Sequence, residues 1–267
     1  MSTSMPPSQR VEAVAIAHRI LDALGREKRA VSLATLSRAL GMTPTRVLRH
    51  LSTLVELRLV ERDESASYRL GLGLVELGQR AAAHHDLARI AYPVLLELNE
   101  AMGQATYLVR PHRDHSVIWL SFESADLPQL TMTPGMRLSL TGSVCGRAIL
   151  AFRDRLPLYT RFGAPPELDS PDPPRSPEEL AERLAQIRKR FYDGLGLEPG
   201  STLYSLAAPV IDHTGEAVGS LGVIGFSVTA LPRRAAILAA LLAAAQKISR
   251  SLGCKLVWPR PCAGEPV

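Results

Sequence analysis

Several features that define common protein classes are missing from this sequence of 267 residues. It has only three cysteines, Cys145, Cys254 and Cys262, and their spacing fits neither a disulfide framework nor a zinc finger. No apolar run reaches the roughly 18 residues that a membrane span needs. The first ten residues, MSTSMPPSQR, lack the apolar region of a signal peptide. We therefore expect a cytoplasmic protein that has no membrane partner.

Motifs of several catalytic and metal-binding classes are also absent. The sequence contains no Gly-rich phosphate loop and no nucleophile elbow. His112, Asp114 and His115 could be interpreted as metal ligands, but they fall in a short segment between two expected strands, where a polar hairpin loop is the simpler interpretation. We therefore predict no metal and no cofactor.

The composition is that of a globular protein with an uneven charge. Hydrophobic residues make up 46% and charged residues 21% of the chain, whose length favours about two domains. Residues 1–73 hold 11 Lys and Arg against 7 Asp and Glu, whereas residues 74–267 hold 20 against 19. The positive excess therefore lies in the N-terminal part, as a nucleic-acid-binding module requires.

The stretch 32–71 has the pattern of a helix, a tight turn and a second helix. Ser32 is a good N-cap for a helix over residues 33–40, and Gly41 suits the turn that ends it. Thr43 and Pro44 then predict the start of the next helix, with the threonine hydroxyl as its cap. Two short helices joined in this way form a helix-turn-helix.

The second of these helices is amphipathic. Val47, Leu51 and Leu54 share one apolar face, flanked by Leu48 and Val55. The opposite face carries hydrogen-bond donors suited to guanine edges and phosphates, so it is typical of a recognition helix in the major groove. An ordinary small helical domain with solvated arginines is the weaker alternative.

Two short alternating segments, 59–62 and 67–70, follow with turn residues between them, which predicts a β-hairpin. This hairpin would be a wing whose Arg62 and Arg69 touch the phosphate backbone. The candidate DNA-binding residues are Ser32, Thr43, Thr45, Arg46, Arg49, His50, Thr53, Arg62, Tyr68 and Arg69.

Residues 72–86 predict a linker helix, which is as consistent with a dimer contact as with simple packing. The pattern beyond it mixes helices with paired strands, and the chain is predicted to be α+β with an antiparallel sheet. We predict helices over 87–102, 143–152, 177–190 and 232–252, strands over 105–110, 116–123, 203–211 and 217–228, and a loose tail over 254–267.

Motifs in both halves resemble the IclR family of bacterial transcription regulators. The N-terminal half has LSRALG at residues 36–41, LSTLVE at 51–56, VER at 60–62 and YRLG at 68–71. The C-terminal half has GRAILA at 146–151 and AAPV at 207–210, followed by Gly215. The resemblance covers residues 10–253, with a DNA-binding domain over 10–71 and an effector-binding domain over 87–253.

The resemblance implies a winged helix-turn-helix joined to a GAF-like domain, homodimers or homotetramers, a double-stranded DNA operator, and a small organic effector, commonly an aromatic or other organic acid. It does not indicate whether the protein is a repressor or an activator. It also implies the effector-binding positions Val144, Cys145, Gly146, Ser205, Gly222 and Ile224, with an acidic contact at Asp193 or Glu198, or none.

At two of these positions the family has small hydroxyl residues, whereas this sequence has Gly222 and Ile224. A less polar pocket would follow, and we expect a bulkier or more aromatic effector than a two- or three-carbon acid. The alternative from another class is an enzyme with Cys145 as nucleophile at a helix N-terminus, where the pKa of a thiol falls. Against it, no sequence spacing places His112, His115 or His213 beside Cys145.

Overall fold

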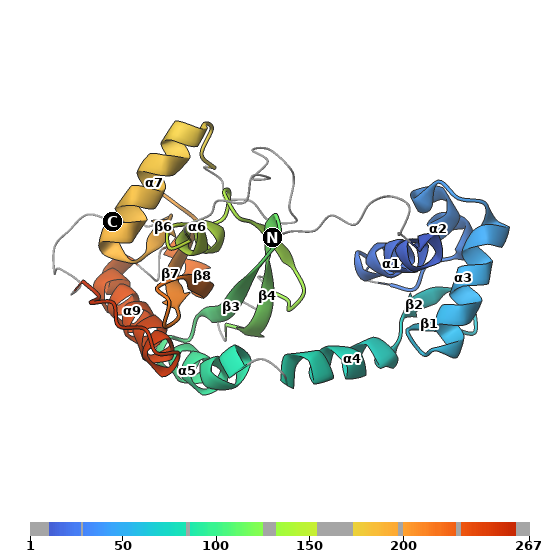
Figure 1. Ribbon diagram of the computed structural model, residues 1–267, viewed down its shortest axis with the longest axis horizontal. Helices are drawn as coiled ribbons and strands as arrows, with labels where there is room; N and C mark the ends of the chain where they lie inside the picture. The colour runs from blue at the N-terminus through green and yellow to red at the C-terminus, as the bar shows by residue number, and fades with distance from the viewer. Residues whose placement is uncertain are drawn as a thin grey trace. The chain divides into compact units, whose positions relative to one another are not determined.

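The chain divides into two compact units, residues 1–85 and residues 86–267 (Figure 1). The structure is a computed structural model that describes residues 11–27, 29–83, 86–124, 132–153, 173–196, 200–227 and 231–259. Within these ranges no helix is long and apolar enough to cross a membrane.

The first unit consists of helices and one hairpin. In chain order its elements are α1 (Glu12–Gly25), α2 (Leu33–Leu40), α3 (Pro44–Glu56), β1 (Val60–Arg62), β2 (Tyr68–Leu70) and α4 (Leu72–Ala83). The apolar stripes of the first three helices meet in one core, in which Ile20, Val47 and Leu51 are fully buried. Because each helix shows only one apolar stripe, the opposite face of α3 remains exposed to solvent.

The turn between α2 and α3 forms as predicted, with one difference in its capping. The Ser32 hydroxyl accepts the Thr35 amide at 3.3 Å, and Gly41 takes the left-handed conformation at φ 64°. The predicted Thr43 cap is wrong, because its side chain makes no capping hydrogen bond. The carbonyl of Thr43 instead accepts the amides of Arg46 and Val47 at 3.0 and 3.1 Å, and Pro44 has no amide hydrogen to satisfy.

The second unit is built on a six-stranded sheet with the order β5-β4-β3-β8-β7-β6, in which every neighbouring pair is antiparallel. Helices α5 and α9 pack on one face, and the short α6 packs on the other with α7 against it (Figure 1). The bounds are α5 (Asp86–Met102), β3 (Ala105–His112), β4 (His115–Phe122), β5 (Arg137–Ser139), α6 (Val144–Leu150), α7 (Pro177–Arg190), β6 (Asp193–Leu195), β7 (Leu203–Ile211), β8 (Ala217–Phe226), a 3-10 turn (Leu231–Arg233) and α9 (Arg234–Ser251).

Strand alternation decides which side chains meet α6. On β3, Leu108 joins the core beneath α5 and α9, whereas Tyr107 and Val109 lie in the core beneath α6. On β8, Leu221 and Val223 join the α5 and α9 face. Since side chains alternate along a strand, Ser220 and Gly222 lie with Tyr107 on the α6 face, and the register pairs Tyr107 with Gly222 directly.

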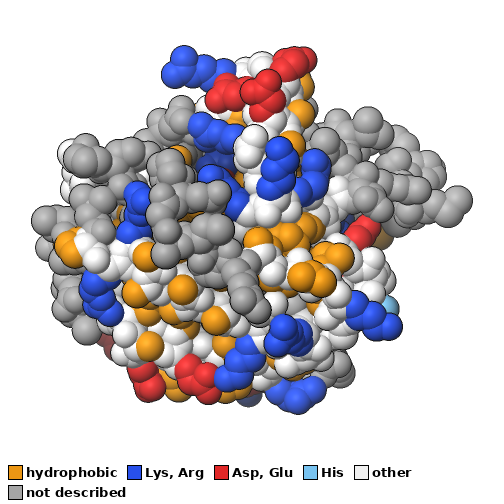
Figure 2. Space-filling model, turned by 90° about the vertical axis from the view of Figure 1, so that its left-hand side faces the viewer, with side chains coloured by type: hydrophobic (Ala, Val, Ile, Leu, Met, Phe, Trp, Pro, Cys, Tyr) orange, Lys and Arg blue, Asp and Glu red, His pale blue; other side chains and the backbone are white. Residues whose placement is uncertain are grey.

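Helix α7 begins and ends as its sequence predicts. Ser176 accepts the Glu179 amide at 3.2 Å, and the Glu179 carboxylate accepts the Arg175 amide at 2.9 Å, which is a form of the capping box. Acidic residues occupy its first turn and basic residues its last, which complements the helix dipole. Figure 2 shows acidic side chains gathered at the top of the view, with Lys and Arg side chains beside and below them.

Several elements of the second unit differ from the prediction. Strands β3 and β4 extend further than expected and leave a tip at Arg113 and Asp114, where Arg113 takes φ 50°. Strand β6 was not predicted, because three residues with one glycine carry no alternating pattern. Glu198 and most of the proline-rich stretch from Pro157 to Pro177 lie outside the described residues.

The tail predicted after Gly253 is anchored to the core at two residues. Cys254 is 9% exposed and Trp258 is 8% exposed, and both belong to the core beneath α5 and α9. The Trp258 ring lies 4.8 Å from the Phe191 ring, centroid to centroid. A lone tryptophan in a proline-containing segment gives no periodic signal, so its packing depends on a tertiary partner.

Candidate functional site

The recognition helix α3 presents its polar face to solvent. Thr45, Arg46, Arg49 and Thr53 are exposed, together with Thr43 and Ser32 near the helix starts. His50 lies at the edge of this face and is half-buried, and its Nε2 is buried without a hydrogen-bond partner within the described part of the chain. The predicted donors therefore lie on the outer side of α3, as major-groove binding requires.

Two of the predicted DNA-binding arginines are engaged with carboxylates in the free protein. Arg46 forms an ion pair with Glu12 of α1 at 2.5 Å, although both side chains are largely exposed. Arg69 donates from Nε and Nη2 to one Glu61 oxygen at 3.0 and 2.9 Å. Exposed pairs of this kind contribute little to stability, so a phosphate group can compete for either arginine.

The hairpin has the predicted strands and turn. Its register pairs Glu61 with Arg69 and Arg62 with Tyr68. The Asp63 carboxylate accepts the Ser67 amide at 2.9 Å, which closes the turn. Arg62 remains exposed, with its guanidinium 5.8 Å from the centre of the Tyr68 ring.

Tyr68 does not fit its predicted place among the DNA-binding residues. It is 3% exposed and packs in the core of the first unit, and its backbone pairs with Val31 in an isolated bridge. In the sequence Tyr68 lies between two polar residues in a short strand. Side chains alternate along a strand, so Tyr68 points into the core while Arg69 points outward. Its role is packing and support of Arg62.

The predicted effector site lies where α6 crosses the sheet. Ser143 caps α6 by accepting the Gly146 amide at 2.9 Å, and its own hydroxyl donates to the Ser139 carbonyl at 2.6 Å. Residues Val144 to Leu150 are all buried. A β-carbon on Gly146 would lie 2.2 Å from the Ser139 carbonyl oxygen, so this glycine allows close packing of α6 on β5.

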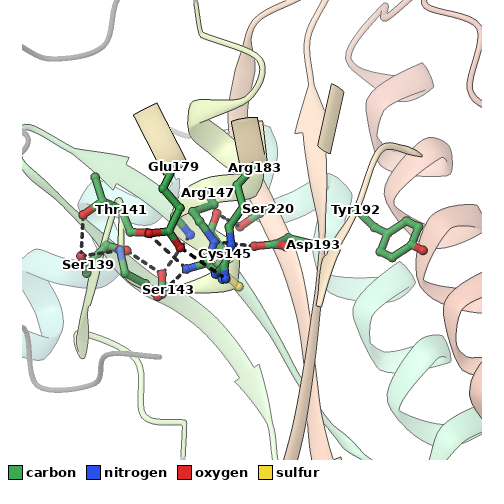
Figure 3. A network of polar contacts seen from close by, with 12 residues as sticks. Ser139, Thr141, Ser143, Cys145, Arg147, Glu179, Arg183, Tyr192, Asp193 and Ser220 are labelled. Carbon is green, nitrogen blue, oxygen red and sulfur yellow. Dashed lines mark hydrogen bonds and ion pairs between the residues drawn. The ribbon is translucent and has the colours of Figure 1, made fainter. Parts of the chain in front are cut away.

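The buried centre of this site is a polar group within apolar surroundings. The Tyr107 hydroxyl lies 3.4 Å from that of Ser205, and the hydroxyls of Tyr107 and Ser220 hydrogen-bond with the Cys145 thiol. Ser220 also donates to the Cys145 carbonyl at 3.1 Å (Figure 3). Burial raises the pKa of Tyr107 well above its usual range and that of Cys145 to about 12, so both groups are neutral donors at physiological pH.

This environment disfavours the enzyme alternative. A nucleophilic cysteine needs a lowered pKa, whereas the pKa of Cys145 is raised by burial. The two side chains that hydrogen-bond with it, Ser220 and Tyr107, are not bases at neutral pH, and the nearby Asp193 charge raises its pKa further. Over the described ranges, no group of three His, Cys, Asp or Glu side chains is placed to hold a metal ion.

Gly222 and Ile224 do not make the site simply less polar. A β-carbon on Gly222 would lie 2.3 Å from the Tyr107 ring, so the tyrosine occupies the space that a hydroxyl residue would fill. Ser205 and Ile224 are paired in register, and Ser205 is only half-buried, so this end of the site is the more accessible one. The phenol supplies the polarity that the glycine lacks.

The Asp193 carboxylate is held in a buried network of ion pairs. It is 2% exposed, and its carboxylate accepts Arg147 Nε at 2.6 Å and Arg190 Nη2 at 3.1 Å. Arg147 is fully buried and also donates to the carbonyls of Thr141 and Gly142 at 3.2 and 2.6 Å (Figure 3). This network anchors the turn before α6 to β6.

Sequence reasoning missed Tyr107, Ser220 and Arg147. Tyr107 and Ser220 lie in strands that looked like ordinary core, and only the register brings them to Cys145. The one available signal was glycine within a β-strand, which often marks a large ring packing across it. Arg147 lies in the GRAILA motif, but a charged residue on a short helix is usually solvated, so the sequence did not indicate its burial.

A winged helix-turn-helix joined to a separate α+β domain defines a class of DNA-binding regulators. A family model for the IclR helix-turn-helix domain matches residues 13–64, and one for the C-terminal part of bacterial IclR transcriptional regulators matches residues 79–250. The chain therefore belongs to the IclR family, transcriptional regulators that bind DNA operators and carry an effector-binding C-terminal domain.

Individual relatives agree along nearly the whole chain. The regulator KdgR of Escherichia coli is 30% identical over 240 residues, which cover 88% of this chain and 90% of KdgR. KipR of Bacillus subtilis is 27% identical over 229 residues, covering 85% and 91%.

Solved structures have the same fold. An IclR regulator from Alicyclobacillus acidocaldarius matches with a TM-score of 0.74 and 25% identity over 92% of this chain and 100% of that one. An IclR homologue from Microbacterium hydrocarbonoxydans, solved with 4-hydroxybenzoate, matches with a TM-score of 0.73 over 90% and 98%, and at 18% identity it supports the fold alone.

Proposed function

We propose that this chain is an operator-binding regulator whose DNA affinity is set by a small aromatic acid bound between α6 and the sheet. The observation that carries the effector part is the polar group formed by buried Tyr107, Cys145 and Ser220 with half-buried Ser205 in an otherwise apolar layer. A ligand site needs such a group, because a few fixed polar atoms orient a ligand while apolar walls bury its body.

The expected ligand follows from the chemistry of this group. Tyr107 and Ser205 are neutral hydroxyls 3.4 Å apart, so both can donate to a carboxylate or phenolic oxygen. The neighbouring apolar side chains, among them Val109, Ile118 and Ile224, suit an aromatic ring. The complex of the Microbacterium homologue with 4-hydroxybenzoate is consistent with this class of ligand.

Thermal unfolding with a ligand panel tests the effector proposal. We expect 4-hydroxybenzoate or a related aromatic acid to raise the melting temperature of the full chain, because a ligand that binds only the folded state stabilises it. Two- and three-carbon acids should have no effect. A rise with the small hydrophilic acids alone would overturn the aromatic assignment.

Paired variants connect the ligand to the site. Ser205→Ala and Tyr107→Phe each remove one hydroxyl, so we expect them to reduce the ligand-induced shift while leaving DNA binding without ligand unchanged. Thr214→Ala is a matched control, because it removes an exposed hydroxyl from the turn between β7 and β8. Equal ligand shifts in all three variants would place the ligand elsewhere.

A further inference from the structure

The carboxylate of Glu61 lies between two functional parts of the first unit. One of its oxygens accepts hydrogen bonds from Nε and Nη2 of Arg69 across the wing hairpin. The other accepts a hydrogen bond from the backbone amide of Leu72 at 3.3 Å. Leu72 is the first residue of the linker helix α4, and amides in the first turn of a helix have no partner within it. Glu61 therefore contacts the wing arginine and caps the linker helix at the same time.

The junction between the wing and α4 is also fixed by the backbone. The amides of Gly71 and Gly73 donate to the carbonyls of Leu59 and Arg58 at 2.9 and 3.0 Å. A β-carbon would lie 2.4 Å from the Arg58 oxygen at Gly71 and 2.7 Å from it at Gly73. The start of α4 is thus packed directly on the segment that leads into β1.

The negative charge of Glu61 at this junction opposes DNA binding. The side chain of Arg69 is 64% exposed and that of Glu61 is 37% exposed, so both groups reach the surface that the wing would present to a phosphate. While Glu61 accepts hydrogen bonds from Nε and Nη2 of Arg69, this arginine offers less of its charge to DNA, and the carboxylate itself repels a phosphate.

We propose that Glu61 is a positioning residue that restrains the DNA contact of Arg69 in the free protein and caps the linker helix with the same carboxylate. The proposal rests on the proposed DNA-binding function. It predicts that the two roles can be separated, because glutamine keeps an oxygen for the Leu72 amide but loses the charge, whereas alanine loses both.

The test measures binding of the full chain to the DNA upstream of its own coding region, and to an unrelated duplex, from about 50 to 200 mM salt. We expect Glu61→Gln to bind more tightly at low salt, with a plot of log affinity against log salt that is steeper by about 0.9, the value of one added phosphate contact. In an Arg69→Ala background, Glu61→Gln should leave the slope unchanged.

Amide hydrogen exchange measures the capping role without DNA. Glu61→Ala should speed exchange at the start of α4, whereas Glu61→Gln should not. Glu12→Gln is the matched control, because it releases Arg46 of α3 from its ion pair and does not touch α4. It should change DNA binding and leave exchange in α4 as in the wild type.

The outcomes distinguish this inference from the function on which it rests. A wild-type slope for Glu61→Gln, or unchanged exchange for Glu61→Ala, would overturn the dual role of Glu61. If the wild-type chain bound neither duplex at low salt, the DNA-binding function would fail first, and the exchange comparison would still decide whether Glu61 caps α4.

Discussion

At the scale of single residues, burial determines the chemistry of the charged and polar groups in the second unit. Arg147 is fully buried, and Asp193 and two carbonyl oxygens accept hydrogen bonds from its guanidinium. Burial has the largest effect on Cys145 and holds it as a neutral thiol. The same short helix therefore carries a buried guanidinium that is paired with a carboxylate and a buried neutral thiol.

Cys145 should be unreactive in the folded protein. Because its pKa is raised to about 12 and the residue is fully buried, the thiolate that attacks an alkylating reagent is scarce at neutral pH. We expect iodoacetamide near neutral pH to leave Cys145 unmodified until a denaturant is added, as measured by peptide mass spectrometry. Rapid modification of the native protein would restore the nucleophile interpretation.

At the scale of elements, the recognition helix and the wing serve different parts of one interface. Helix α3 exposes Arg49 at its middle, whereas Arg62 lies in a hairpin that is anchored by Tyr68. A helix in the major groove reads base edges, and a wing touches the backbone, which is the same for every sequence. Substitutions in α3 should therefore change sequence preference, whereas substitutions in the wing should change the affinity for all sequences alike.

Arg49→Ala should cost about 1–3 kcal/mol on the preferred DNA and relax sequence preference, if Arg49 reads a base. Arg62→Ala should weaken binding evenly across sequences and reduce the salt slope by about one. Arg46→Ala and Arg69→Ala extend the comparison to the arginines that hold ion pairs in the free protein. Affinity measured on specific and unrelated duplexes separates the classes, and identical behaviour of all four variants would contradict this division.

At the scale of the whole molecule, exposed apolar side chains on α4 point to self-association. Val75 is 57% exposed and Leu77 is 53% exposed on this helix, and Leu72 at its start is 69% exposed. Exposed apolar side chains gathered on one helix often mark an interaction site. We therefore propose that the 29.0 kDa chain forms a dimer or tetramer through contacts that include α4.

Light scattering after size-exclusion chromatography should give two or four times the mass of one chain. Val75→Glu and Leu77→Glu should shift the protein toward monomer and weaken DNA binding, because a dimer contacts two half-sites. Glu76→Lys is the control on the same helix, because it changes an exposed polar residue. A monomeric wild-type protein, or variants with unchanged mass, would exclude this contact.

The sequence alone determined the elements that depend on local patterns. The helix-turn-helix, the wing and the long strands of the sheet follow from periodicity, caps and turn residues, which are properties of neighbouring positions. Ser32 and Gly41 act as their positions predict. The exposed arginines of α3 were predictable for the same reason, because one apolar stripe determines which face is left for solvent.

Only the tertiary structure decided the contents of the candidate effector site. Tyr107 reaches Gly222 through strand register, and Asp193 meets Arg147 across a gap of 46 residues in sequence. Tyr68 and Trp258 became core residues because partners from distant segments cover them. These pairings depend on long-range packing and desolvation, which leave no periodic trace in a single sequence.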